Sequence, residues 1–368
     1  MKIESINPRT GEIIKTFDEF PIEKVAGVVN RAKVAQEKWH KLPKERRIEI
    51  IRKVLTILDQ EKDHLADIVY REAGFPHSDT LGEITGDIIP GTETHITDYQ
   101  KIKSLDYSNN DYQSAVNFIP KGVIGHIGIW NYPVWQTFIT AIPALLTGNA
   151  VVYKISEYTT MTGLKIAEII RKAGVLEDVF IPLIGGPELG KKLVKSQVDM
   201  IVFTGGSETG SDIIKNAGTK PLLLELSGND AGIVCDDCDL DMAVKGIVYG
   251  TFLHGGEVCT RIKRLFLPEK IADEFLKKYL DKVKSLRIGQ EISPLIRDTA
   301  RKKVEKQVQE ATSEGAELLA GGKTPKLPGY YFEPTVLLYT NTEKKIYPDE
   351  IFGPVSLIQI VKDENEAV

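Results

Sequence analysis

Apolar side chains recur at helical spacing in the first 72 residues of the chain. Two segments, 22–41 and 44–72, place them three or four positions apart with polar residues between them. The apolar positions are Val25, Val28, Val29, Ala32, Ala35 and Trp39 in the first segment, and Ile48, Ile51, Leu55, Leu58, Leu65 and Ile68 in the second. This spacing predicts two amphipathic helices whose apolar faces lie in a core.

The pattern changes after residue 106. Residues 107–119 are polar and partly alternating, which predicts an exposed β-hairpin. Beyond it, short apolar runs typical of buried strands alternate with segments typical of helices. The strands are expected over 122–129, 150–155, 179–184 and 200–204, and the helices over 135–146, 160–173 and 187–196. This alternation predicts a parallel sheet with crossover helices, and ligands bind at the carboxyl ends of such strands.

A second alternation follows in the last part of the chain. Strands are expected over 222–225, 232–235, 264–267, 317–320 and 335–338, and helices over 239–252, 270–285 and 298–314. The predicted fold class is therefore α/β in two parts. One domain spans 1–227, with the hairpin inserted at about 105–120, and a second α/β domain spans 228–368. The final residues, DENEAV, are typical of the beginning of a helix.

The amino-acid composition excludes several classes of protein. Of the 368 residues, 42% are hydrophobic and 27% charged, which is ordinary globular composition and excludes a disordered chain. The net charge of −5 leaves no broad basic surface, so we expect neither a nucleic acid nor a membrane as partner. Three cysteines, and an N-terminus without an apolar signal segment, favour a reducing compartment. We therefore expect a cytoplasmic protein.

The segment PKGVIGHIGIWNYP at 120–133 combines a glycine-rich strand with a polar end. Glycine recurs at positions 122, 125 and 128, a spacing that a helix would not favour and that a strand tolerates where another group approaches its backbone. Asn131 at the end of this strand could donate amide hydrogen bonds to a developing negative charge. Taken alone, a glycine-rich strand is more often structural than functional.

Two further strand ends carry groups suited to a nucleotide. Lys154 and Glu157 offer a cation and an acceptor for the paired hydroxyls of a ribose, although two solvated charges would give the same pattern. The segment FTGGSETG at 203–210 follows an apolar strand and precedes an expected helix. Small residues at a helix N-terminus bind phosphate through backbone N–H groups. This loop is neither a Walker A loop nor a strict GxGxxG.

Glu225 and Cys259 are the candidate catalytic groups. Glu225 lies within the apolar run LLLELSG, where a carboxylate is costly unless it is paired or lines a cavity. In a cavity it could act as a general base, whereas on a solvated strand face it would be inert. Cys259 follows two glycines, and oriented N–H groups at such a loop lower the pKa of a thiol. A lone cysteine is nevertheless usually an inert core residue.

Other cysteines and histidines support weaker alternatives. Cys235 and Cys238 form a CxxC pair, but no second pair or nearby histidine completes a zinc site, so we expect no metal. Acidic neighbours also disfavour their thiolates. His126 or His254 could instead act as the base to Cys259 in a Cys/His hydrolase.

The order and spacing of these motifs resemble the NAD(P)-dependent aldehyde dehydrogenase superfamily over essentially the whole chain. The segments that carry the resemblance are NPxTGE at 7–12, PKGVIGHIGIWNYP at 120–133, KxSE at 154–157, FTGGSETG at 203–210, LELSG at 224–228, GxxC at 256–259 and EIFGPV at 350–355. The resemblance implies a Rossmann-like cofactor domain at 1–227 and a catalytic domain at 228–368. It also implies a homo-oligomer, a dimer or tetramer, assembled through the hairpin.

The resemblance further implies an activity, the oxidation of an aldehyde to a carboxylic acid with reduction of NAD(P). Cys259 would attack the aldehyde, and the side chain of Asn131 with the Cys259 backbone N–H would hold the oxyanion. After hydride transfer to the nicotinamide, Glu225 would activate the water that hydrolyses the thioester. The implied cofactor contacts are Lys154 and Glu157 at the adenine ribose, Trp130, Gly205, Gly206 and Ser207 at the pyrophosphate, and Glu350 and Phe352 at the nicotinamide riboside. Glu157 favours NAD, because a carboxylate repels a 2′-phosphate, although NADP stays possible.

Several positions depart from the family pattern. These are Ile155, Gly206, Ser227, Asn229, His254 and Glu257, where the family usually has Pro, Ser, Gly, Lys, Asn and Gln. Glu257 would raise the pKa of the Cys259 thiol if the two groups are close. Family members continue well past the EIFGPV segment, so the resemblance predicts a truncated catalytic domain. The alternative to an active enzyme is an impaired family member that only binds nucleotide or serves a structural role.

Overall fold

The computed structural model describes residues 2–109, 111–340, 342–343 and 345–368. The chain divides into two compact units, each formed from three segments. Unit 1 comprises Met1–Ser5, Ile13–Glu72 and His77–Leu226, and unit 2 comprises Ile6–Glu12, Ala73–Pro76 and Ser227–Val368. Two short N-terminal segments therefore belong with the C-terminal unit.

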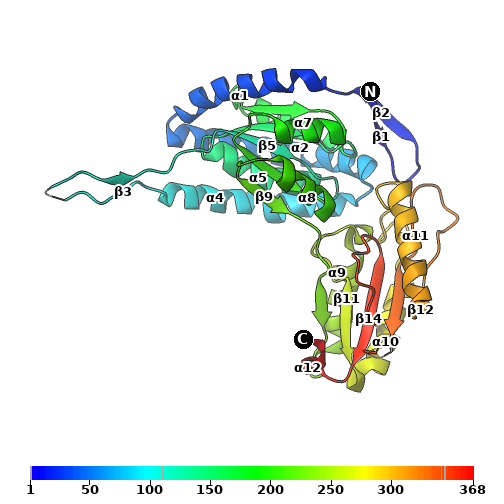
Figure 1. Cartoon of the computed structure of the whole chain (residues 1–368). Coiled ribbons are helices and arrows are strands. Elements are labelled where there is room, and N and C mark those ends of the chain that lie inside the picture. Colours follow the sequence, from blue (N-terminus) through cyan, green and yellow to red (C-terminus); the bar gives the residue numbers. More distant parts are fainter. Residues whose placement is uncertain (1, 110, 341, 344) are drawn as a thin grey trace. The chain divides into compact units, whose positions relative to one another are not determined.

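Unit 1 is built around a five-stranded parallel sheet with the strand order β7-β6-β5-β8-β9 (Figure 1). The strands are β5 (Val123–Ile127), β6 (Ala150–Lys154), β7 (Phe180–Leu183), β8 (Met200–Thr204) and β9 (Leu222–Glu225). The chain runs outward from β5 through β6 to β7 and then returns to the other side of β5. In a doubly wound sheet, this reversal between β5 and β8 opens a crevice at the carboxyl ends of the strands. The prediction of a Rossmann-like parallel sheet is confirmed.

Helices of unit 1 flank this sheet. They are α1 (Val25–His40), α2 (Lys44–Glu72), α5 (Pro133–Leu146), α6 (Thr160–Lys172), α7 (Pro187–Lys195) and α8 (Ser207–Asn216). The predicted apolar positions of α1 and α2 are all buried. Helix α2 also buries Arg47 and Glu72, and each has a partner far along the chain, Leu146 and Thr162 respectively. Glu72 accepts hydrogen bonds from the backbone N–H groups of Met161 and Thr162, and so caps the start of α6.

Several elements of unit 1 had no counterpart in the sequence pattern. They are the strands β1 (Lys2–Ile6) and β2 (Ile13–Asp18) and the consecutive helical segments α3 (His77–Gly82), η2 (Glu83–Ile88) and α4 (Ile89–Lys101). The short helix η1 (Ile22–Lys24) precedes α1 within the segment 22–41 that the sequence predicted as one helix. After α4, β3 (Leu105–Asp106) and β4 (Ala115–Val116) pair antiparallel and are exposed. Residue 110, within this hairpin, lies outside the described part of the chain.

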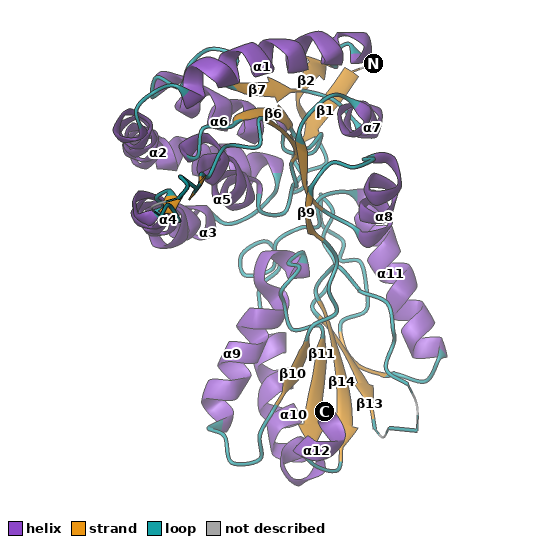
Figure 2. Cartoon of the chain, turned by 60° about the vertical axis from the view of Figure 1, so that its left-hand side comes forward, coloured by secondary structure: helices purple, strands orange, loops and turns teal. Residues whose placement is uncertain are grey.

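Unit 2 contains a second five-stranded sheet, with the order β10-β11-β14-β13-β12 (Figure 2). Its strands are β10 (Ala231–Ile233), β11 (Arg264–Pro268), β12 (Glu317–Ala320), β13 (Thr335–Tyr339) and β14 (Val355–Val361), and only β12 runs antiparallel to its neighbour among them. Its helical segments are α9 (Leu240–Phe252), η3 (Leu253–Gly256), α10 (Glu269–Lys284), α11 (Asp298–Ser313) and α12 (Glu364–Ala367).

Successive residues of β13 and β14 face two separate cores. Val336 and Ile358 pack with α9 and α10, whereas Leu337 and Leu357 pack with α11. A strand buried on both faces is typical of parallel sheets covered by helices on each side. The helix expected at DENEAV is present as α12, and its N-cap is Asp363. None of the helices in the described residues is both long and apolar enough to cross a lipid bilayer.

Candidate active site

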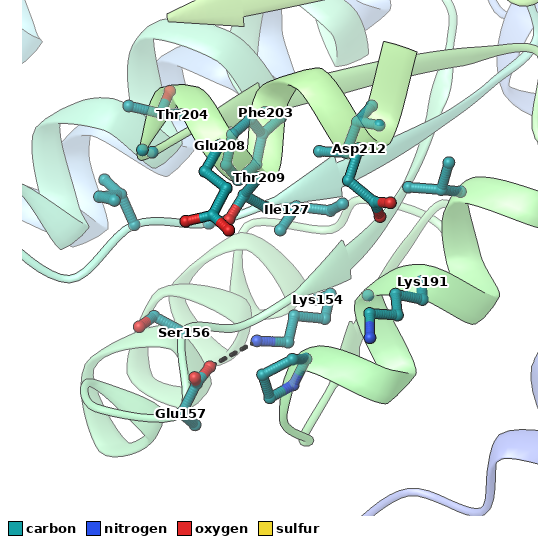
Figure 3. Close-up of a pocket in the computed structure, with 18 of the residues that line it drawn as sticks. Ile127, Lys154, Ser156, Glu157, Lys191, Phe203, Thr204, Glu208, Thr209 and Asp212 are labelled. Carbon is teal, nitrogen blue, oxygen red and sulfur yellow. Dashed lines mark hydrogen bonds and ion pairs between the residues drawn. The ribbon is translucent and has the colours of Figure 1, made fainter. Parts of the chain in front are cut away.

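A cavity of about 770 Å³ lies in unit 1 at the carboxyl ends of β5, β6 and β8, with α7 and α8 contributing to its walls (Figure 3). Five residues predicted to contact a cofactor line it: Trp130, Lys154, Glu157, Gly205 and Gly206. Ser207 is the first residue of α8, next to this lining. The volume falls within the roughly 300–1,000 Å³ typical of small-molecule and cofactor sites. The position matches the crevice expected from the strand order.

Lys154 and Glu157 form an ion pair inside this cavity. The Lys154 Nζ lies 2.6 Å from the Glu157 Oε2 (Figure 3). Lys154 is the last residue of β6 and is buried, whereas 20% of the Glu157 side chain is exposed. The cation and the acceptor therefore meet at the end of one strand, as a pair of ribose hydroxyls requires.

The turn between β8 and α8 has a shape that depends on glycine. A Cβ atom at Gly205 would collide with the ring of Phe203, and the Gly205 N–H donates to the Glu225 carbonyl oxygen at 2.9 Å. At Gly206, the N-cap of α8, a Cβ would meet no atom within 4 Å. Glycine at this N-cap has no side chain that could cap the helix start. Backbone N–H groups at a helix N-terminus beside a cavity suit a phosphate, so these residues fit a dinucleotide.

The glycines at 125 and 128 make room for the protein's own side chains. A Cβ at Gly128 would lie 2.7 Å from the Tyr153 ring, and one at Gly125 would lie 2.9 Å from Ile201 Cδ1. The expected close approach to this strand is therefore confirmed, and the approaching groups belong to β6 and β8.

Asn131 and Glu225 lie at two other strand ends of unit 1. Asn131 follows β5 and is 4% exposed, immediately before the N-cap of α5. Glu225 ends the edge strand β9, and it is exposed rather than enclosed by its leucine neighbours. Its backbone is paired with Thr204 across the sheet.

A buried polar network that the sequence did not indicate lies beside these residues. His126 is 1% exposed, and burial lowers its pKa to about 4. One of its ring nitrogens lies 3.1 Å from the Gln136 Oε1. The Gln136 side-chain amide in turn donates to the hydroxyl of Thr204, which lines the cavity. The ring of His126 is therefore held by a neutral hydrogen-bonding partner, and burial favours its uncharged form.

Cys259 lies in unit 2, in a loop after η3. Its side chain is half-buried. Gly255 and Gly256 precede it with positive φ angles of 63° and 76°, a conformation that glycine adopts readily. A Cβ at Gly256 would collide with the carbonyl of Gly353. The loop that bears the cysteine is thus held against the segment 350–355.

Glu257 is fully buried in this loop. Its carboxylate oxygen accepts a hydrogen bond from the backbone N–H of Ile296 at 3.1 Å. Burial raises the pKa of Glu257 well above its usual value, so the folded protein favours the uncharged carboxyl.

Unit 2 also holds Glu350, Phe352 and two cations that the sequence did not indicate. Glu350 and Phe352 are half-buried in the segment that precedes β14. Arg261 and Lys263 are buried just after Cys259 and contact this segment. In the sequence, these two cations alternate with apolar residues immediately before a buried strand, and this pattern could have indicated them.

The remaining candidates have other surroundings. Among the described residues, no group of three or more His, Cys, Asp or Glu side chains is placed to hold a metal ion. Cys235 is exposed, and burial together with acidic neighbours raises the pKa of Cys238. The ring of His254 stacks on Phe75, with centroids 4.1 Å apart.

Comparisons with known proteins define the class to which this fold and these residues belong. The model of the aldehyde dehydrogenase family matches residues 1–368. A D-glyceraldehyde dehydrogenase (NADP⁺) of Picrophilus torridus is 30% identical over 99% of this chain and 77% of its own length. The betaine aldehyde dehydrogenase of Bacillus subtilis is 32% identical over 99% of this chain and 78% of its own length.

Solved structures agree with these sequence matches. A betaine aldehyde dehydrogenase from Staphylococcus aureus in complex with NAD⁺ has a TM-score of 0.95 and 29% identity, and the match covers all of this chain and 77% of the other. The chain belongs to the aldehyde dehydrogenase family. The resemblance, the α/β fold and the class of NAD(P)-dependent aldehyde dehydrogenase are confirmed.

Proposed function

We propose that this protein oxidises an aldehyde to a carboxylic acid through a covalent intermediate on Cys259. The observation that carries the proposal is the half-buried Cys259 in a loop formed by two left-handed glycines. A partly exposed thiol can reach a substrate, whereas a fully buried one is inert. Family membership supports the reaction type.

The first step forms a bond between the Cys259 sulfur and the aldehyde carbon. The carbonyl oxygen then carries a negative charge, which the Asn131 side-chain amide and the Cys259 backbone N–H stabilise. When bound, NAD(P) accepts the hydride from this carbon. The acyl group is left as a thioester on Cys259.

The second step is hydrolysis of this thioester, with Glu225 as general base. Its exposed position at the end of β9 lets water reach the carboxylate. Glu225 removes a proton from a water molecule, the water oxygen bonds to the acyl carbon, and the carbon–sulfur bond breaks. The departing sulfur takes the proton that Glu225 removed, so the products are the carboxylic acid and the free thiol, and Glu225 is again a carboxylate.

Residues 1–227 serve as the NAD(P)-binding domain, and 228–368 carry the catalytic cysteine. Lys154 and Glu157 hold the adenine ribose, and the turn of Gly205, Gly206 and Ser207, together with Trp130, holds the pyrophosphate. Glu350 and Phe352 contact the nicotinamide riboside. NAD is the preferred cofactor, because Glu157 repels a 2′-phosphate and already pairs with Lys154. The named relatives include an NADP⁺ enzyme and a protein bound to NAD⁺.

The protein works as a homo-oligomer, a dimer or tetramer, in the cytoplasm. Exposed apolar side chains of the hairpin region support self-association. We propose no substrate class narrower than aldehydes, since the named relatives act on different aldehydes.

Two variants test the mechanism, with reduced cofactor followed by absorbance over a panel of aldehydes. Cys259→Ala should abolish formation of reduced cofactor while cofactor binding persists. Glu225→Gln should give a burst of about one equivalent per subunit and then slow turnover, because the thioester forms but is hydrolysed slowly. Full activity of Cys259→Ala would contradict the mechanism. Cofactor binding without turnover in the wild-type chain would favour the second candidate, a nucleotide-binding protein without activity.

A further inference from the structure

Lys263 places a buried ammonium group between the backbone of Cys259 and a carboxylate. Only 1% of its side chain is exposed. Its Nζ donates a hydrogen bond to the carbonyl oxygen of Cys259 and lies 3.2 Å from the Glu350 Oε1. A buried ammonium is costly unless partners replace its lost water, and these two groups are such partners.

The backbone of Lys263 is fixed on both sides by neighbouring strands. Its N–H donates to the Asp230 carbonyl at 3.1 Å, just before β10. Its own carbonyl accepts from the Leu357 N–H at 3.1 Å, in β14. The base of the side chain therefore cannot shift easily, and the ammonium is held at one place before any substrate arrives.

Arg261 and Gly256 attach the same loop to the segment 350–355. The Arg261 guanidinium is buried and donates to the carbonyls of Ile351 and Val355. Gly256 lies so close to the Gly353 carbonyl that no side chain fits between them. The loop of Cys259 and the segment of Glu350 are thus joined at three places, and Lys263 contributes the contact at Cys259 itself.

We propose that Lys263 is a positioning residue that fixes the backbone of Cys259 and links it to Glu350. The inference rests on the proposed function, in which Cys259 is the nucleophile and Glu350 contacts the cofactor. A hydrogen bond to the Cys259 carbonyl restrains the peptide plane that follows Cys259, and so limits movement of the Cα atom that carries the thiol. Lys263 forms no bond to the substrate and transfers no proton.

Two substitutions separate the charge of Lys263 from its bulk. Lys263→Met keeps the apolar stem and removes the ammonium, whereas Lys263→Arg keeps a cation. Cys259 alkylation by iodoacetamide, located by peptide mass mapping, reports the thiol across a pH series, and kcat and KM for NAD are measured separately. Lys263→Met should lower kcat by about tenfold to a hundredfold, because small displacements of a reacting atom in a bound complex cost that much. The alkylation rate should also fall, because the thiol is no longer held in one direction. Lys263→Arg should recover part of the loss.

Lys302→Met is the matched control, because Lys302 lies on α11 in the same unit with 65% of its side chain exposed. It should change neither rate. A double-mutant cycle with Glu350→Gln completes the test, since residues that act through one contact give non-additive effects. Lys263→Met and Glu350→Gln should together lower the alkylation rate by less than the product of their separate effects.

The proposal is overturned if folded Lys263→Met is alkylated at the wild-type rate, or if the two substitutions act independently. If Lys263→Met does not fold, the test uses Lys263→Arg and Glu350→Gln. The proposal is then overturned if both variants are alkylated at the wild-type rate at every pH. Failure of the proposed function would give a different experimental result. Cys259→Ala would then retain aldehyde oxidation, while the alkylation rates would still report whether Lys263 positions the thiol.

Discussion

Burial favours the uncharged form of the Glu257 carboxyl group, which is negatively charged in water at neutral pH. The group is fully enclosed and accepts a hydrogen bond from the Ile296 N–H. Its pKa is raised well above the usual 4.5 by loss of solvation. Above pH 4.5 the folded state therefore binds more protons than the unfolded state, and this group makes stability fall as pH rises toward its folded pKa.

Glu257→Gln should remove this loss, because glutamine keeps an oxygen acceptor and has no acidic proton. We expect the variant to gain stability relative to wild type as pH rises above 4.5, by about 1.4 kcal/mol for each pH unit until the pKa of the folded state is reached. Urea unfolding across a pH series measures it. Glu291→Gln is the control with opposite sign, since Arg287 lowers the pKa of Glu291 to about 2. Parallel stability curves for wild type and Glu257→Gln would contradict the expectation.

The pair of Lys154 and Glu157 should control the choice between NAD and NADP. Glu157→Gln removes a carboxylate that would repel a 2′-phosphate and leaves the Lys154 ammonium available to bind it. We expect the ratio of kcat/KM for NADP to that for NAD to rise about tenfold, equivalent to roughly 1.4 kcal/mol. Steady-state kinetics with both cofactors measures the ratio.

Glu208→Gln is the matched control, because Glu208 lines the same cavity from α8 (Figure 3). It should change the ratio less than Glu157→Gln does. An equal change in both variants would show only a general effect of charge in the cavity.

Residue identity alone predicted which groups could carry chemistry, but not which charges would be buried. Arg47 is enclosed because it donates to the carbonyls of His40, Leu42 and Leu146, the last of them 99 positions away. Lys263 is enclosed because Glu350 lies beside it. Such partners become visible only when the chain is folded, so these cations look like solvated charges in the sequence.

At the scale of the element, the turn from β8 to α8 offers a paired test of the candidate phosphate site. Gly205→Ala should shift the turn, because its Cβ would collide with Phe203, and should weaken NAD binding about tenfold or more. Gly27→Ala in α1 should bind NAD as wild type does, since its Cβ meets no atom within 4 Å and Gly27 does not line the cavity. Fluorescence titration with NAD measures both. Equal binding by the two variants would argue against this turn as part of the cofactor site.

Regular elements with a clear period were the easiest to predict. Helix α2 spans Lys44–Glu72 and strand β8 spans Met200–Thr204, as their patterns indicated. The central strand β14 was missed, because Ser356 and Gln359 interrupt its apolar residues and leave neither a continuous apolar run nor a strict alternation. The helical stretch 77–101 was also missed. It carries few buried apolar residues, and its middle part, η2, departs from α-helical geometry.

At the scale of the whole molecule, the groups of the proposed mechanism are distributed over both units. The nucleophile Cys259, the positioning residue Lys263 and the proposed cofactor contact Glu350 belong to unit 2, whereas Asn131 and Glu225 belong to unit 1. Segments 6–12 and 73–76 join unit 2 despite their place in the N-terminal sequence. Arg9, in the first of these segments, donates hydrogen bonds to the carbonyls of Gly74 and Gly289. No local sequence pattern predicts contacts between residues so far apart in the chain.

The hairpin region carries the clearest unpartnered apolar surface of unit 1. Phe118 is 63% exposed and Ile119 is 78% exposed, just after β4. Large apolar groups that gather on one exposed segment favour contact with another protein surface, here a second copy of the chain. The segment extends away from the rest of its unit (Figure 1), which leaves both of its faces accessible to a partner.

Phe118→Asp with Ile119→Asp should therefore lower the oligomeric state, because burying two carboxylates in an interface is costly. Analytical ultracentrifugation of the full chain measures the mass across a concentration series. Val34→Asp with Ile214→Asp is the control, since both positions are exposed apolar residues of helices in the same unit. An unchanged mass in the hairpin variant, or an equal loss in the control, would remove the hairpin as the site of self-association.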